Sequence, residues 1–195
     1  MKTILIDKNK KGKPNIKLTV QRVEPEVWYD LGFYKHHYLT SKLNKACKCL
    51  LFSWDDNPVA FVGIINTPRN NIPYGMSISR IVILPDYQGM GLSTTICNFC
   101  GGLVKSLGNE YRLYIKTIHE LMGNYFSHSD KWKPTTYNGK TRDSKFFVTE
   151  SGKYNNRFIR SSYCYEYIGE KIDGYQDIFK PISEMRRLKK VNGIV

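Results

Sequence analysis

The chain of 195 residues has no long hydrophobic run. A membrane-spanning helix needs at least about 18 predominantly apolar residues in succession, and no segment approaches that length. The apolar stretch within residues 1–7 is also too short for the core of a secretory signal peptide. We therefore expect a cytoplasmic protein that has no membrane partner.

Cysteine is scarce as well, with five copies. An odd number without a secretory signal favours free thiols over disulfides. Cys97 and Cys100 have the spacing of a zinc or redox pair, but no second Cys or His pair has ligand spacing. We interpret them as packed cysteines on a helix and expect no metal.

Acidic residues are few, with 17 Asp and Glu against 30 Lys and Arg, which gives a net charge of +13. Part of this charge lies in residues 8–13 and 186–190. A polyanionic partner such as DNA or RNA would explain the excess. A solvated basic surface with no such partner would explain it equally well.

The overall composition is that of a folded protein, with 41% hydrophobic and 13% aromatic residues. A chain of this length ordinarily forms one domain with a full core. We expect a single domain over residues 1–195, with its core at about 16–169 and a basic tail at 171–195. The oligomeric state is not determined by the sequence.

The most informative segment runs from Ser77 to Thr94. A β-branched apolar run ends before Pro85, a turn with Gly89 and Gly91 follows, and a helix pattern then continues to Leu107. Backbone N–H groups at the start of such a helix converge on one point at its positive end. The segment therefore predicts a site for a phosphate or diphosphate.

Two common phosphate loops do not fit this segment. A Walker loop needs Lys after its last glycine, and Leu92 stands there. A dinucleotide fingerprint needs a third glycine, where Thr94 stands, and an acidic residue that closes the next strand. Glu110 precedes that strand.

The remaining pattern predicts a mostly β first half, followed by a parallel strand–helix–strand unit. We expect strands at 16–23, 49–54, 58–65, 78–84 and 111–118, with 49–65 a hairpin and 111–118 parallel to 78–84. We expect helices at 26–43, 92–107 and 119–126. We expect loops at 67–75 and 130–142, and a closing antiparallel pair at 145–150 and 157–169.

The segment Gln88-Gly-Met-Gly-Leu-Ser93 resembles the signature of the GNAT acetyltransferase superfamily, Gln/Arg-x-x-Gly-x-Gly/Ala. Ser93 departs from the usual last residue but is also small. The resemblance implies an α/β fold with a mixed central sheet, two splayed parallel strands and flanking helices. It implies acetyl-CoA as cosubstrate. The implied cofactor-binding residues are Ile81, Val82, Ile83, Gln88, Gly89, Met90, Gly91, Leu92 and Ser93.

Acetyl transfer to an amine needs a proton acceptor, a donor to the oxyanion and an acid for the thiolate. The resemblance implies a main-chain donor within Ile81–Ile83 and places Tyr125 nearest to the tyrosine that protonates the thiolate. The resemblance also implies that His36 and His37 border the acceptor groove, and because histidine as a residue type titrates near neutral pH, we predict them as catalytic residues.

Three further residues, Tyr38, Arg80 and Arg160, are candidates for contact with the acceptor. The predicted function is N-acetyltransferase with an unknown amine acceptor. The His36–Leu39 segment also resembles a phage- and ATPase-associated GNAT subgroup and, more distantly, Mom-type DNA-modifying relatives. Two alternatives thus stay open: a nucleic-acid base-modifying enzyme and a non-catalytic basic nucleic-acid-binding protein.

Overall fold

The computed structural model describes residues 2–6, 16–37, 40–140 and 162–182. In these ranges eight strands form one sheet in the order β1-β2-β3-β4-β5-β6-β8-β7. The strands are β1 (Lys2–Ile6), β2 (Ile16–Val23), β3 (Lys48–Trp54), β4 (Asn57–Asn66), β5 (Gly75–Ile83), β6 (Arg112–Thr117), β7 (Trp132–Pro134) and β8 (Tyr163–Tyr167). The α-helices are α1 (Val27–Asp30), α2 (Leu92–Lys105) and α3 (Glu120–His128), and short 3-10 helices are η1 (Phe33–His36), η2 (Pro85–Tyr87) and η4 (Gln176–Phe179).

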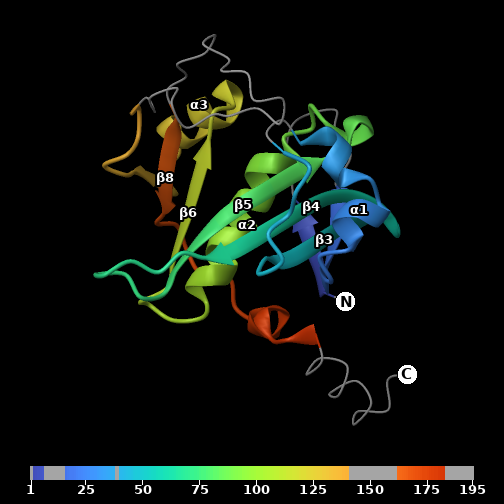
Figure 1. Ribbon diagram of the computed structural model, residues 1–195, viewed down its shortest axis with the longest axis horizontal. Helices are drawn as coiled ribbons and strands as arrows, with labels where there is room; N and C mark the ends of the chain where they lie inside the picture. The colour runs from blue at the N-terminus through green and yellow to red at the C-terminus, as the bar shows by residue number, and fades with distance from the viewer. Residues whose placement is uncertain (1, 7–15, 38–39, 141–161, 183–195) are drawn as a thin grey trace.

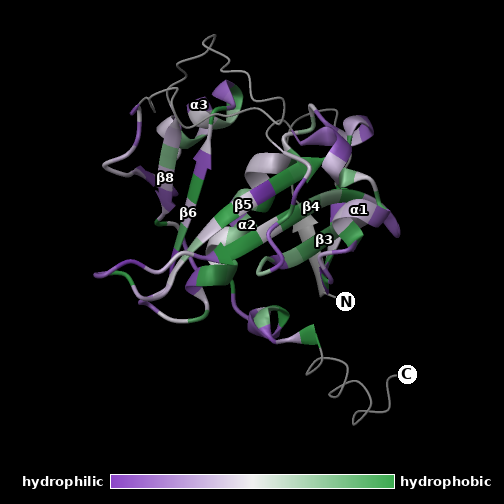
Figure 2. Ribbon diagram, viewed as in Figure 1, coloured by the Kyte–Doolittle hydropathy of each residue, from purple (hydrophilic) through white to green (hydrophobic). Residues whose placement is uncertain are grey.

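Helices α1 and α2 cover opposite faces of the sheet (Figure 1). The buried side of α2 packs with apolar residues of β2–β6 in the larger core cluster. Trp28 of α1 and Phe33 of η1 pack on Phe61 and Val82 in a second cluster on the other face. The sheet is therefore buried on both sides at its centre, and Figure 2 shows the matching apolar run along β3, β4 and β5.

Helix α2 confirms the predicted helix to within two residues of its end. Its buried face includes Leu92, Ile96 and Leu103, each at most 1% exposed. Cys97 and Cys100 lie on the same face and are fully buried free thiols. They act as small apolar side chains in the core, as expected.

The predicted hairpin is confirmed in β3 and β4, which pair antiparallel from Lys48↔Ile64 to Trp54↔Asn57. Asp55 and Asp56 form its turn with φ of +46° and +63°. Two consecutive positive φ values match the twist of the flanking strands, and Asp tolerates them better than most residues.

The pair β5 and β6 is parallel, as predicted, and its pairing is short. It runs from Gly75↔Arg112 to Ile78↔Ile115, while β5 continues to Ile83. On its other edge β5 pairs with β4, where Gly63 faces Arg80 and Ile64 faces Ile78. Ser79 is thus an extra residue on β5, and such a bulge bends the strand that carries it. The two parallel strands separate at this bend.

The predicted helix at 26–43 is wrong. Helical backbone covers only α1 and η1, and Gly32 stands between them with φ of +71°. A left-handed residue ends a helix. The apolar positions that suggested one long helix, such as Trp28, are instead buried by two short turns joined at an angle.

The structure also differs from the sequence analysis in two places, and one predicted strand lies outside the described residues. Strand β1 was not predicted, and it adds an edge to β2. The loop expected at 130–142 contains the short strand β7. The strand at 145–150 lies outside the described residues, while β8 pairs with β6 and β7.

Part of the segment expected as a tail packs on the core. Ile178 is 7% exposed, and the ring of Tyr175 meets Phe99 edge-on at 5.4 Å between centroids. Residues 183–195 lie outside the described part of the chain. In that part no helix has the length and apolar character to cross a membrane.

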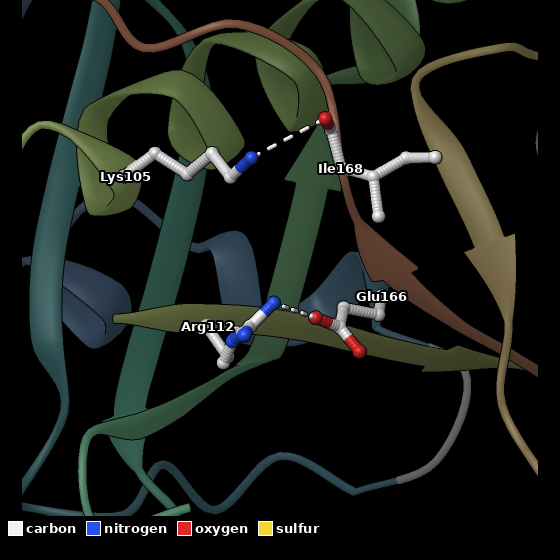
Figure 3. A network of polar contacts seen from close by, with 4 residues as sticks. All are labelled: Lys105, Arg112, Glu166 and Ile168. Atoms are coloured by element: carbon white, nitrogen blue, oxygen red, sulfur yellow. Dashed lines mark hydrogen bonds and ion pairs between the residues drawn. The ribbon is translucent and has the colours of Figure 1, made fainter. Parts of the chain in front are cut away.

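Two polar contacts tie β8 and the residue after it to neighbouring elements (Figure 3). Lys105 Nζ donates to the carbonyl oxygen of Ile168 at 3.3 Å, and Arg112 pairs with Glu166 at 3.0 Å. The Arg112 side chain is 45% exposed. An exposed pair of this kind contributes at most about 1 kcal/mol, so apolar packing holds this part of the sheet in place.

The packing of α2 on β8 can be tested at Gly101. A Cβ atom on Gly101 would lie 2.3 Å from Cγ of Tyr167. We expect Gly101→Ala to lower the free energy of unfolding by about 1–2 kcal/mol, because overpacking outweighs the gain of about 1 kcal/mol in helix propensity. Thermal melting is the measurement. The control is Asn124→Ala on the exposed side of α3, which should not lower the midpoint. A midpoint for Gly101→Ala at or above the native one would contradict this packing.

Candidate active site

A cavity of about 480 Å³ opens where β5 and β6 separate. Its walls come from η1, β5, the turn after η2, the start of α2, the end of β6 and the start of α3. The cavity therefore lies at the carboxyl ends of two parallel strands, the usual place for ligands in α/β sheets.

One end of the cavity is the glycine turn, Gln88–Gly91, and the start of α2. Gly89 and Gly91 have φ of +75° and +69°, which glycine adopts without strain. The Gln88 side chain donates to the carbonyl oxygen of Ile83 at 2.9 Å and so fixes the turn against β5.

The start of α2 has neither a side-chain cap nor an acidic residue in its first turn. The first N–H groups of a helix have no partner within the helix, and they carry its positive partial charge. Apart from Gly89 and its two chain neighbours, no described heavy atom lies within 4 Å of the position where a Cβ of Gly89 would be. The turn thus leaves open space beside free donors, which suits a diphosphate.

The free edge of β5 forms a second wall. Leu84 N–H donates to Val59 on β4, whereas the carbonyl oxygen of Ile83 accepts from Gln88. Since the main-chain groups of alternate strand residues point to the same side, Ile81 and Ile83 both face the gap. The gap therefore has main-chain donors and acceptors that an extended ligand arm could bind.

Eight of the nine predicted cofactor residues line the cavity: Ile81, Val82, Ile83, Gln88, Gly89, Gly91, Leu92 and Ser93. Met90 is not on its wall, and its side chain packs against the larger core cluster.

His36 and His37 also line the cavity. Burial, followed by the charge of Arg80, lowers the pKa of His37 from 6.5 to about 4, against a backbone hydrogen bond with Thr40 that raises it. His37 is consequently neutral at pH 7, and the lowered pKa also makes it a weaker base than an ordinary histidine. The ring also meets Trp28 edge-on at 5.9 Å, which fixes its position.

Arg80 lines the cavity beside these histidines. Its Nη1 donates to the Ser79 carbonyl at 2.7 Å and its Nη2 to the Lys42 carbonyl at 2.9 Å. Its Nε is buried and has no hydrogen-bond partner among the described residues. The guanidinium is therefore held in a fixed position by backbone oxygens.

The structure adds residues that the sequence analysis missed. Lys116 and Thr117 at the end of β6, and His119 and Leu121 after it, line the cavity. Their place in the sequence could have indicated them, because they lie at and just after the end of the second parallel strand, where ligands bind in such sheets.

Tyr125 is not on the cavity wall. Its hydroxyl accepts a hydrogen bond from Asn98 Nδ2 at 2.6 Å, and Asn98 Oδ1 accepts from Trp132 Nε1 at 2.7 Å. This polar chain connects α3, α2 and β7. Tyr38 and Arg160 lie outside the described residues, so the structure does not place them.

The described residues contain no group of three or more His, Cys, Asp and Glu side chains arranged to hold a metal ion.

Comparison with protein families gives one match, in which the acetyltransferase (GNAT) family covers residues 16–125, more than half of the chain. The chain belongs to the GNAT acetyltransferase family. The predicted fold class is thus confirmed, and the cavity of this GNAT acetyltransferase lies where β5 and β6 separate. A search of curated protein sequences gave no match.

Solved structures share the fold at low identity. The Escherichia coli ribosomal-protein-S18-alanine N-acetyltransferase is 12% identical over 80% of this chain and 96% of its own, with a TM-score of 0.54. Arabidopsis thaliana Naa50, in complex with a bisubstrate analogue containing CoA, is 13% identical over 78% and 99%, with a TM-score of 0.56. Vibrio cholerae spermidine/spermine N-acetyltransferase is 14% identical over 76% and 91%, with a TM-score of 0.53. None of these matches supports the phage-associated or Mom-type subgroup.

Ser93 tests whether the start of α2 binds the CoA diphosphate. A carboxylate at this position stabilises the helix start by about 0.3–1 kcal/mol but repels a diphosphate. We expect Ser93→Glu to keep or raise the melting temperature and to weaken acetyl-CoA binding at least about tenfold, measured by calorimetry. The control Ser93→Ala should bind normally. Unchanged binding by Ser93→Glu would rule out this placement.

The low pKa of His37 predicts a pH dependence of stability. A group with a pKa of 6.5 when unfolded and about 4 when folded binds more protons in the unfolded state between these values. Its contribution to stability is therefore complete above pH 6.5 and is lost as the pH falls toward 4. Denaturant unfolding should show a smaller loss over this window for His37→Asn than for the native chain or for His36→Asn. Equal losses would contradict the buried position of His37.

Proposed function

We propose that this GNAT acetyltransferase transfers the acetyl group of acetyl-CoA to the nitrogen of an amine. The observation that carries the proposal is the cavity at the separation of β5 and β6, whose lining includes both the uncapped start of α2 and His37. The helix start suits an anionic cosubstrate, and a neutral imidazole can accept the proton that the amine loses.

Acetyl-CoA fits this cavity through groups already present. The glycine turn and the first turn of α2 would hold the diphosphate. The main-chain groups of Ile81 and Ile83 would bind the amides of the pantetheine arm in the manner of an added strand. This course directs the thioester along β5, toward the bend at Ser79 and the side chain of Arg80.

The reaction forms one bond and breaks one. The amine nitrogen attacks the thioester carbon, and the C–S bond breaks as the amide forms. His37, neutral at pH 7, takes the proton from the nitrogen. A main-chain N–H of Ile81 or Ile83 would stabilise the oxyanion of the tetrahedral intermediate.

The positive charges of Arg80 and Lys116 favour the neutral form of the acceptor amine. Both side chains line the cavity, and nearby positive charge lowers the pKa of an ammonium group. More of the bound amine is then in the neutral, nucleophilic form. Protonation of the thiolate by Tyr125 stays a prediction, because its hydroxyl lies against Asn98 and not on the cavity wall.

No observation in the described residues favours the two nucleic-acid alternatives over N-acetyl transfer. The comparisons give them no support; they were suggested by the net charge of +13 and by the His36–Leu39 segment. The acetylation assay below includes DNA and RNA as acceptors and so tests the base-modifying alternative.

The function is tested by incubating the purified protein with radiolabelled acetyl-CoA and a panel of amines, peptides, DNA and RNA. We expect label in one class, with release of free CoA thiol. His37→Gln should lower kcat by about 10²-fold or more, as loss of a general base does. The control His128→Gln, on the outer side of α3 with its ring bonded to Asn124 and Ser127, should not. Thiol release no faster than hydrolysis with every acceptor would refute the function.

A further inference from the structure

The charged side chains on the cavity wall all carry one sign. Arg80 and Lys116 are cationic, and three histidines also line the wall: His36, His37 and His119. No Asp or Glu among the described residues lines the cavity. An acetyltransferase for a polycation would need carboxylates to bind the second positive charge of its acceptor, and the described part of this wall has none.

Arg80 and Lys116 lie on the same face of the sheet. Arg80 pairs with Gly63, whose Cβ position points at Leu43 and Cys47 on the face covered by α1. Lys116 alternates along β6 with Ile115, which is buried on the α2 face, so its side chain points to the face of Arg80. The two cations thus face the side of the cavity away from α2.

Neither cation has a carboxylate partner among the residues that the structure describes. Among the described residues the ion pairs are made by Arg112, Lys171 and Lys180, and none involves Arg80 or Lys116. Arg80 uses one N–H on each Nη for a backbone carbonyl, and each Nη carries a second N–H. A fixed guanidinium with donors to spare is suited to a carboxylate or a phosphate.

We propose that the acceptor is a small amine with an anionic group, a carboxylate or a phosphate, which Arg80 and Lys116 bind while the amine faces the thioester. This inference rests on the proposed function, which places the CoA diphosphate at the glycine turn and leaves these two cations to the acceptor. The low pKa of His37, to which Arg80 contributes, agrees with a site of positive potential.

The test uses pairs of acceptors that differ only in the anionic group. L-alanine is compared with L-alaninamide, and O-phosphoethanolamine with ethanolamine, while spermidine represents polycations. We expect kcat/KM for at least one anionic member to exceed that of its neutral partner at least about tenfold and to exceed that of spermidine. The pair that shows the preference identifies a carboxylate or a phosphate as the group bound.

The variants Arg80→Gln and Lys116→Gln should each reduce that preference at least about fivefold, mainly through a higher KM for the acceptor, with the KM for acetyl-CoA unchanged. Because Arg80 also holds the Lys42 carbonyl, folding is checked by thermal melting, and the exposed Lys116 provides the second, independent variant. The matched controls Arg69→Gln and Lys133→Gln change exposed residues that are not on the cavity wall and should keep the preference.

The outcomes separate this inference from the function itself. Acetylation of spermidine or of the neutral partners in preference to the anionic amines overturns the inference and leaves the proposed function standing. An unchanged preference in both cavity variants overturns the role of Arg80 and Lys116. Binding of acetyl-CoA without acetylation of any member of the panel contradicts the proposed function, and the inference fails with it.

Discussion

The site depends on one bend in β5. The extra residue Ser79 interrupts the regular pairing with β4 at the level where pairing with β6 ends. Beyond it no strand of the described residues pairs with β5 on the β6 side, so main-chain groups of Ile81 and the N–H of Ile83 remain for a ligand. A regular β5 paired with β6 along its whole length would fill this gap and leave no cavity.

The two faces of the sheet contribute different groups to the cavity at this bend. The α2 side provides the uncapped helix start, which suits the anionic end of a cosubstrate. The α1 side provides His36, His37 and Arg80. The break at Gly32 matters for the second group, because it turns the chain from α1 into η1 and delivers the histidine pair to the cavity. A continuous helix would have carried these residues on in the direction of its axis.

Local signals in the sequence predicted the central part of the fold well. The spacing of apolar residues in 92–105, the turn at Asp55 and Asp56, and the β-branched run before Pro85 each depend on neighbours along the chain, and each was confirmed. The prediction of one helix at 26–43 was wrong because it placed Trp28 and Leu39 on one apolar face and gave too little weight to Gly32, which ends a helix. Strand β1 was missed because it forms by pairing with β2, a strand that is not adjacent to it in the sequence.

The candidate site was predicted in part for the same reason. The glycine turn is a local motif, and eight of its nine associated residues line the cavity. Lys116 and His119 were missed, and Tyr125 was chosen for its place along the chain, although Asn98 of α2 holds its hydroxyl away from the cavity. Side-chain direction at the end of a strand or on a short helix depends on what packs beside it.

The sequence by itself determined the elements that follow from periodicity and turn chemistry, together with an anion site at the start of a helix, because these are properties of contiguous residues. Only the tertiary structure decided where β5 and β6 part, which cations share a face, and that no described carboxylate joins them on the cavity wall. Those features arise from contacts between segments that are distant in the chain. The free energy of such contacts depends on both partners, so it cannot be read from either segment alone.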